Sequence, residues 1–165
     1  MTIRHSERAT VMEQQHFNRN ILIAVDESEN AHRAVDYVAQ LLGGIEGFNV
    51  TLLHVIPDPE EDYFPTPEDR EHWLENYRGR IERQLDSYRK ILIAAGFDES
   101  AVRVRSTLKY CPSMAKCILE ERDQLDYSTI VVGRQGLSRS EEFLFGSISN
   151  KIVNHAQNCT VWVVE

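Results

Sequence analysis

Short apolar runs alternate with amphipathic stretches along most of this chain, and that alternation restricts the possible folds more than any other feature. The run 21–25 is apolar without interruption, as in a strand buried on both faces. After it, Ala31, Val35, Val38 and Leu42 recur at steps of four, three and four, which predicts a helix with one apolar stripe. Strands and helices that alternate in this way form a parallel sheet with helices on both faces.

Four further strands and three further helices are predicted from the same periodicities. The strands cover residues 50–55, 102–108, 129–132 and 160–164, and the helices cover 74–92, 112–121 and 147–156. The stretch 102–108 alternates valine and leucine with arginine, which is typical of a half-exposed edge strand. The prediction is therefore an α/β, Rossmann-like, doubly wound sheet of five parallel strands, in which ligands bind at the carboxyl ends of the central strands.

Glycines mark one of those carboxyl ends. Gly133 ends the predicted fourth strand, Gly136 follows in the loop after two intervening residues, and the pair Gly146-Ser147 opens the last helix. Glycine adopts backbone angles closed to other residues and carries no Cβ that would block a ligand. The first turn of a helix offers unpaired N–H groups to an anion. The spacing predicts a phosphate site between the fourth strand and its helix. If the first and fourth strands are neighbours, Asp26 lies at the same crevice.

Composition excludes several classes of partner. Eighteen Lys and Arg against 26 Asp and Glu give a net charge of −8, which argues against nucleic acid or an anionic membrane. The apolar runs are too short to span a membrane. Three cysteines without a CxxC pair, Cys111, Cys117 and Cys159, are interpreted as buried free thiols of a reduced, cytoplasmic protein.

Two segments lie outside the regular pattern. Residues 1–18 lack periodicity and are predicted to form a flexible extension, so that the folded domain covers 19–165. Residues 58–71 carry seven acidic residues and three prolines and are interpreted as a solvated loop.

Several polar residues have two possible roles. Asp26 could bind ribose or a metal ion, or it could stabilise the entry to the first helix. Arg134 could neutralise phosphate or point into solvent. For Ser147 we favour a phosphate contact over a nucleophile, for His54 a satisfied core position, and for Trp162 the core or an interface. No catalytic residue is predicted.

The chain lacks both GxGxxG in its first turn and a Walker lysine, but it resembles a single-domain universal stress protein over residues 19–165. The resemblance rests on ILIAVDESENAHRAV, on LLHV in the second strand, and on the G-2x-G-9x-G-[ST] motif met by Gly133, Gly136, Gly146 and Ser147. It implies the strand order 3-2-1-4-5, a homodimer, and ATP or AMP in the crevice between the first and fourth strands.

The resemblance also implies the site residues. Positions aligned with Ala24, Val25 and Asp26 contact adenine and ribose, and Val55 offers its backbone to adenine. The phosphates are surrounded by the segments that contain Gly133, Arg134, Gly136, Gly146, Ser147, Ile148 and Ser149. Glu27 stands where the family often has glycine, and Ser128 replaces a usual aspartate. Glu141 and Glu142 lie in the phosphate loop and would repel the nucleotide unless they turn outward or bind it through Mg²⁺.

The predicted last strand is apolar on both faces and would lie at a sheet edge, which favours pairing with a second chain through Val161, Trp162, Val163 and Val164. The function expected is a nucleotide-responsive signalling dimer in the stress response. A slow, Mg²⁺-dependent ATPase and a nucleotide-free interaction module are the two alternatives.

Overall fold

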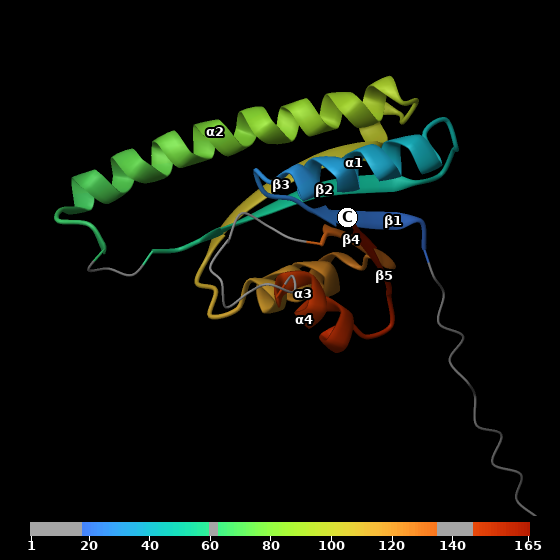
Figure 1. Ribbon diagram of the computed structural model, residues 1–165. Helices are drawn as coiled ribbons and strands as arrows, with labels where there is room; N and C mark the ends of the chain where they lie inside the picture. The colour runs from blue at the N-terminus through green and yellow to red at the C-terminus, as the bar shows by residue number, and fades with distance from the viewer. Residues whose placement is uncertain (1–17, 60–62, 135–146) are drawn as a thin grey trace, which may run out of the picture.

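A five-stranded parallel sheet forms the centre of the molecule (Figure 1). The computed structural model describes residues 18–59, 63–134 and 147–165. The strands follow the order β3-β2-β1-β4-β5, as the family resemblance implies. Their bounds are β1 Asn20–Ala24, β2 Asn49–Pro57, β3 Val102–Lys109, β4 Thr129–Gly133 and β5 Thr160–Val164. Because all four pairings are parallel, all five carboxyl ends lie at one edge of the sheet.

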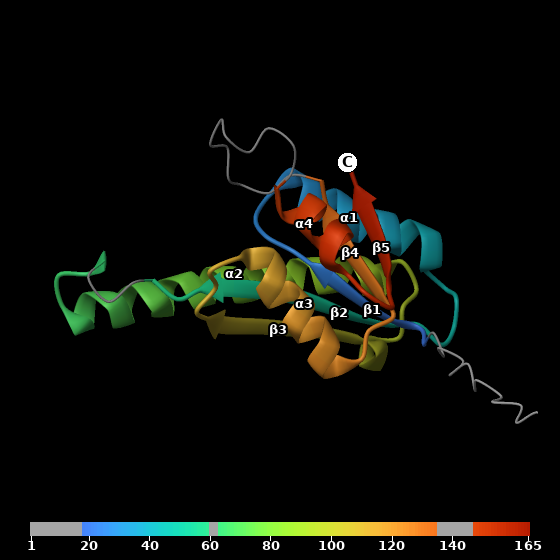
Figure 2. The ribbon, with the colours of Figure 1, turned by 90° about the horizontal axis from the view of Figure 1, so that it is seen from below.

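Four α-helices cover the sheet, two on each face (Figure 1). Their bounds are α1 Glu29–Leu42, α2 Pro67–Ala94, α3 Met114–Leu125 and α4 Ser147–His155, and a short 3-10 turn, η2 Glu99–Ala101, precedes β3. Helices α1 and α2 cover one face, and α3 and α4 cover the other (Figures 1 and 2). The amino-terminal part of α2 extends well past the sheet (Figure 1).

Capping residues determine where the helices begin. The Ser28 side chain accepts a hydrogen bond from the Ala31 N–H and so caps α1. Thr66 caps α2 in the same way, and Pro67 occupies its first turn. The interpretation of 58–71 as a loop is therefore wrong for residues 67–71, because acidic residues there stabilise the positive end of α2. Helix α3 begins at Met114, two residues later than predicted, and Ser113 occupies the position before its first turn.

Each face of the sheet has its own apolar core. Ile21, Ile23 and Leu52 pack beneath α1 and α2, together with the fully buried Tyr88 of α2. Leu22 and Ile130 point to the other face, against α3 and α4. Alternate residues of β1 thus enter opposite cores, which explains why this strand is continuously apolar.

The structure confirms β3 and β5 as the edge strands. In β3 and in α4, side chains are less buried than the periodicity indicates. β3 was predicted to bury one row of side chains, yet Val104 is 47% exposed and only Val102 is buried within that strand. In α4, Ile152 is buried, whereas the neighbouring Val153 is 51% exposed. Periodicity identified these elements correctly but overestimated how far their neighbours cover them.

The prediction of three buried free thiols is wrong for two cysteines. Cys111 and Cys117 form a disulfide with their Cα atoms 6.0 Å apart, and Cys159 is free but only half-buried. The chain reverses direction between β3 and α3, and this reversal brings Cys117 in the first turn of α3 close to Cys111 just after the strand. A spacing of six residues carries no sequence signal for that pairing.

The predicted extension, residues 1–18, lies outside the described residues except for Asn18. The Asn18 backbone N–H donates to Ser128 Oγ at 2.7 Å, and its side chain donates to the Asp126 carbonyl. Ser128, the departure from the family aspartate, thus anchors the chain just before β1. Within the described ranges, no helix is long and apolar enough to cross a membrane.

Candidate nucleotide site

The candidate site lies where β1 and β4 end side by side. Ala24 pairs with Val132 of β4 and with Leu53 of β2, so β1 is central to this edge. The Val25 N–H continues the ladder by donating to the Leu53 carbonyl at 2.9 Å. Successive connections leave β1 toward β2 on one side and reach β4 on the other, which makes this position the topological switch point of the sheet.

Asp26 follows directly, and its carboxylate takes part in the entry to α1. Its Oδ1 accepts a hydrogen bond from the Ser28 N–H at 2.9 Å, which closes a turn immediately before the helix. The helix-entry role considered for Asp26 is thus present in the structure. It also fixes the carboxylate at the carboxyl edge of β1, where the sequence predicted it.

Two aromatic side chains of α2 and His54 of β2 hold the backbone around Asp26 in place. His54 Nδ1 lies 2.8 Å from the Val25 carbonyl oxygen, and its Nε2 lies 3.2 Å from the Tyr77 hydroxyl. A neutral ring that donates from Nδ1 and accepts at Nε2 satisfies both contacts. The Tyr88 hydroxyl donates to the Asp26 carbonyl at 3.3 Å. His54 is therefore the satisfied core histidine that the sequence predicted.

Burial lowers the pKa of His54 below its ordinary value of 6.5, although the hydrogen bond to Val25 and the charges of Asp26 and Glu27 act in the opposite direction. The Arg80 charge adds to the lowering. Below the unfolded pKa, the unfolded chain takes up a proton that the native state resists. The stabilising contribution of neutral His54 is therefore complete above pH 6.5 and is lost as the pH falls from there through the lowered pKa.

We expect the free energy of unfolding to decrease on acidification from about pH 7.5 to about pH 5.5, with His54 contributing no more than about 1.4 kcal/mol per pH unit below its unfolded pKa. Urea denaturation at several pH values measures the slope. His54→Gln should flatten it, while His155→Gln, at an exposed position, should leave it as in the wild type. Parallel slopes for the wild type and His54→Gln would contradict the assignment.

Glu27, which stands where the family often has glycine, does not add an uncompensated charge to the site. Its Oε1 lies 2.8 Å from Nε of Arg80 on α2, and that guanidinium stacks over the Tyr77 ring at 5.0 Å. The pair is partly exposed and contributes little to stability. Its consequence for the site is electrostatic, because it balances one of the two adjacent carboxylates.

Gly133 has a packing role that the sequence did not predict. A Cβ at this position would lie 2.6 Å from the backbone carbon of Asn30 and 2.7 Å from its carbonyl oxygen. The space left by the missing side chain is filled by the first turn of α1. Gly133 is also not among the described residues with positive φ. The glycine thus permits close packing of β4 on α1.

Arg134 and Ser149 connect the end of β4 to its neighbours. The Arg134 N–H donates to the Val164 carbonyl at 2.7 Å, and the buried Ser149 hydroxyl donates to the Arg134 carbonyl at 2.9 Å. The Arg134 guanidinium pairs with Glu165, an outcome that neither the phosphate nor the solvent interpretation included. The first turn of α4 is therefore fastened directly to the carboxyl end of β4.

The remaining predicted residues divide into two groups. Ala24, Val55 and Ile148 belong to the apolar cluster on the α3 and α4 face, with Val55 buried. Gly136, Gly146 and the loop glutamates Glu141 and Glu142 lie outside the described residues, and for Ser147 the structure describes only its place at the start of α4. Among the described side chains, no group of three or more His, Cys, Asp or Glu could hold a metal ion.

Comparison with known proteins agrees with this architecture. Residues 18–165 match the model of the universal stress protein family. A putative universal stress protein of Staphylococcus haemolyticus is 27% identical over 146 residues, covering 88% of this chain and 84% of that protein. The universal stress protein UspA of Lactobacillus plantarum has a TM-score of 0.70 at 20% identity, over 91% of this chain and 99% of that one.

A second similar structure contains a nucleotide. The universal stress protein of Archaeoglobus fulgidus in complex with dAMP has a TM-score of 0.58 at 20% identity, over 91% of this chain and 98% of that chain. The fold is thus the α/β fold of these universal stress protein structures, and its switch point lies between β1 and β4. The chain belongs to the universal stress protein family.

Sequence reasoning missed the residues that support the site from α2. Tyr77, Arg80 and Tyr88 were assigned to an amphipathic helix, and nothing in the periodicity distinguished them from ordinary core or surface positions. Each of the three contacts His54, Asp26 or Glu27 from α2, and only the packing of α2 beside α1 reveals these contacts.

Proposed function

We propose that the protein binds an adenine nucleotide, ATP or AMP, at the carboxyl edge between β1 and β4 and acts as a nucleotide-responsive dimer in the stress response. The observation that carries the proposal is the switch point itself, where Asp26 follows β1 beside the end of β4 and the first turn of α4 is bonded to that end. The dAMP complex of the Archaeoglobus fulgidus relative supports the choice of ligand.

The residues present fit such a ligand. Unpaired N–H groups of a helical first turn suit phosphate, and α4 begins at Ser147, next to the Gly133, Gly136 and Gly146 motif. The Asp26 carboxylate would accept hydrogen bonds from ribose hydroxyls, and the backbone of Val55 would orient adenine. Mg²⁺, if it binds, would take Asp26 or the phosphates together with water as ligands.

Nucleotide release tests the proposal. The purified protein is denatured and the supernatant is chromatographed for adenine nucleotides, and thermal unfolding is followed with and without added ATP. The wild type should release nucleotide or be stabilised by ATP, and Gly136→Val and Gly146→Val should lose both effects while remaining folded. Gly79→Ala is the matched control, because Gly79 lies in the middle of α2, where, of the described side chains, only the flexible Arg83 guanidinium comes within 4 Å of a new Cβ. Equal behaviour of all four proteins would overturn the assigned site.

The same preparations separate the two alternatives. ADP that forms only with Mg²⁺, and above the background of Gly136→Val, would favour a slow ATPase. A protein that releases no nucleotide and gains no thermal stability from ATP would instead favour an interaction module.

The proposed dimer rests on the exposed edge of β5. Trp162 packs edge-to-face on Tyr37 of α1 at 6.0 Å, and beside them Val163 is 44% exposed. β5 pairs with β4 on one side, while its other edge carries these apolar side chains into solvent within the described structure. Pairing of two such edges would remove them from water.

We expect a dimer at micromolar concentration in sedimentation equilibrium, and we expect Val163→Lys to weaken it by at least about tenfold. A lysine in the paired edge would either be desolvated or hold the two strands apart. Val104→Lys, at a valine of similar exposure on the opposite edge strand β3, should leave the dimer intact. A monomeric wild type, or equal weakening by both substitutions, would exclude this interface.

A further inference from the structure

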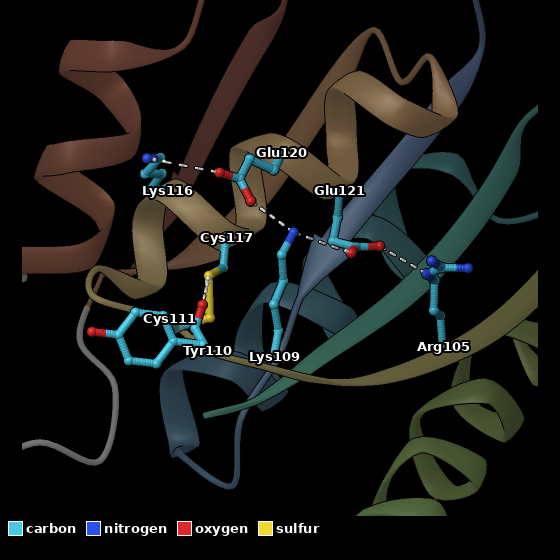
Figure 3. Close-up of polar contacts among 8 residues, drawn as sticks. All are labelled: Arg105, Lys109, Tyr110, Cys111, Lys116, Cys117, Glu120 and Glu121. Atoms are coloured by element: carbon cyan, nitrogen blue, oxygen red, sulfur yellow. Dashed lines mark hydrogen bonds and ion pairs between the residues drawn. A yellow bond between two sulfur atoms is a disulfide. The ribbon is translucent and has the colours of Figure 1, made fainter. Parts of the chain in front are cut away.

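The disulfide lies at the carboxyl edge of the sheet, on the connection between β3 and α3. Cys111 follows β3 by two residues and is partly exposed, whereas Cys117 is buried one turn inside α3. Residues 110–113, which connect β3 to α3, are called here the β3–α3 turn. Figure 3 shows the sulfur bridge directly below α3, beside the charged side chains that join this helix to β3.

The start of α3 depends on this bridge because, unlike the starts of α1 and α2, it has no side-chain cap. Ser28 and Thr66 cap α1 and α2 with side-chain hydrogen bonds, but Ser113 makes no such bond to the first turn of α3. Uncapped first turns fray easily. The bond from Cys117 back to Cys111 is a covalent substitute for the missing cap.

The rest of α3 is held independently of the sulfurs. Glu121 Oε2 lies 2.9 Å from Arg105 Nε, and Glu120 Oε2 lies 2.7 Å from Lys109 Nζ (Figure 3). Both pairs connect α3 to β3 beyond its first turn. Breaking the disulfide should therefore loosen the β3–α3 turn without detaching the helix.

The turn adjoins the candidate site. Cys111 and Met114 pack against the same buried cluster as Val55, Val132 and Ala24. The hydrogen bond from the Asp58 N–H to the Lys109 carbonyl keeps the ends of β2 and β3 together up to this turn. A change in its mobility would thus reach the Val55 side of the nucleotide crevice first.

We propose that Cys111 and Cys117 are a reversible redox pair that adjusts nucleotide affinity by fastening or releasing the β3–α3 turn. The inference rests on the proposed nucleotide binding and adds its regulation. In the oxidised form the wall beside Val55 is preorganised, so less conformational freedom is lost on binding. In the reduced form part of the binding energy is spent on ordering the turn.

The chemistry needs one two-electron oxidant, for which we name a hydroperoxide. The partly exposed Cys111 thiolate attacks the peroxide, becomes a sulfenic acid and releases an alcohol, or water from hydrogen peroxide. The Cys117 sulfur then attacks Cys111 and displaces the oxygen as water, so that two thiols and one peroxide yield one disulfide. A dithiol reductant reverses the step by thiol–disulfide exchange and becomes a disulfide itself.

The test is a calorimetric titration of ATP into the full chain, either oxidised with hydrogen peroxide or reduced with dithiothreitol. Alkylation and mass spectrometry count the free thiols in each sample. We expect one thiol and tight binding after oxidation, and three thiols and a dissociation constant raised about fivefold or more after reduction. Cys111→Ser should bind like the reduced form in both conditions. Cys159→Ser, which keeps the pair, should respond like the wild type.

Hydrogen exchange gives a readout without nucleotide, since reduction should increase exchange in residues 110–117 while α3 beyond them stays protected. Equal ATP affinity of the two redox forms, tighter binding by the reduced form, or three alkylated thiols after peroxide treatment would each overturn the redox inference. Absence of ATP binding in both forms would instead overturn the proposed nucleotide function, so the two failures are distinguishable.

Discussion

Gly133→Ala is expected to lower the free energy of unfolding by about 2–3 kcal/mol, at the upper end of what overpacking usually costs. The new Cβ would lie 2.6 Å from the backbone carbon of Asn30, and a backbone cannot rotate away as a side chain can. Either β4 or the first turn of α1 must move. Urea denaturation of the wild type and variant measures the difference.

The same substitution at Gly79 provides the matched control. Gly79 lies within α2, where the nearest atom to a new Cβ is the flexible Arg83 guanidinium at 3.6 Å. Alanine there should stabilise the protein by about 0.5–1 kcal/mol, because it restricts the unfolded chain and favours the helix. A loss of stability at Gly133 no larger than the change at Gly79 would contradict the packing role. Because α1 begins beside Asp26, Gly133→Ala should also weaken nucleotide binding.

Arg105→Ala is expected to cost about 2 kcal/mol, because it leaves the Glu121 carboxylate buried without its main partner. Glu121 is only 3% exposed, and its Oε2 lies 2.9 Å from Arg105 Nε. Breaking a buried pair typically costs about 3–5 kcal/mol. The expected loss is smaller here because Lys109 Nζ remains 3.8 Å from Glu121 Oε1 and Arg105 is itself partly exposed.

Two comparisons isolate the ion pair. Arg103→Ala removes an exposed arginine from the same strand and should change stability by less than about 0.5 kcal/mol. Replacing Glu121 by leucine in the Arg105→Ala background removes the orphaned charge and should recover most of the loss. If Arg103→Ala and Arg105→Ala were equally destabilising, the buried carboxylate would not be the cause.

The sheet could be predicted from sequence because burial leaves a periodic trace. β5 was predicted with its observed bounds, and each of the other strands was found within two residues of them. A parallel strand covered on both faces is apolar at every position, and that trace is local in the chain. The strand order came from the family resemblance, since periodicity alone does not say which strands are neighbours.

The candidate site could be predicted only in part. Asp26 and Gly133 do lie at one edge of the sheet, as topology required. The packing of Gly133 against Asn30 was missed, because that contact is not visible in one dimension. The pair of Glu27 and Arg80 was missed for the same reason, since 53 residues of chain separate two side chains that lie 2.8 Å apart.

The amino-acid sequence by itself determined the fold class and the half-exposed character of β3, because these depend on hydrophobic periodicity. The strand order, and with it the switch point and the β5 edge, followed from the family resemblance. Tertiary structure alone decided which charges are balanced, which glycine makes room for a helix, and which cysteines are joined. Those features arise when α2 crosses the sheet and when the chain reverses between β3 and α3, so that residues with no local relationship come within bonding distance.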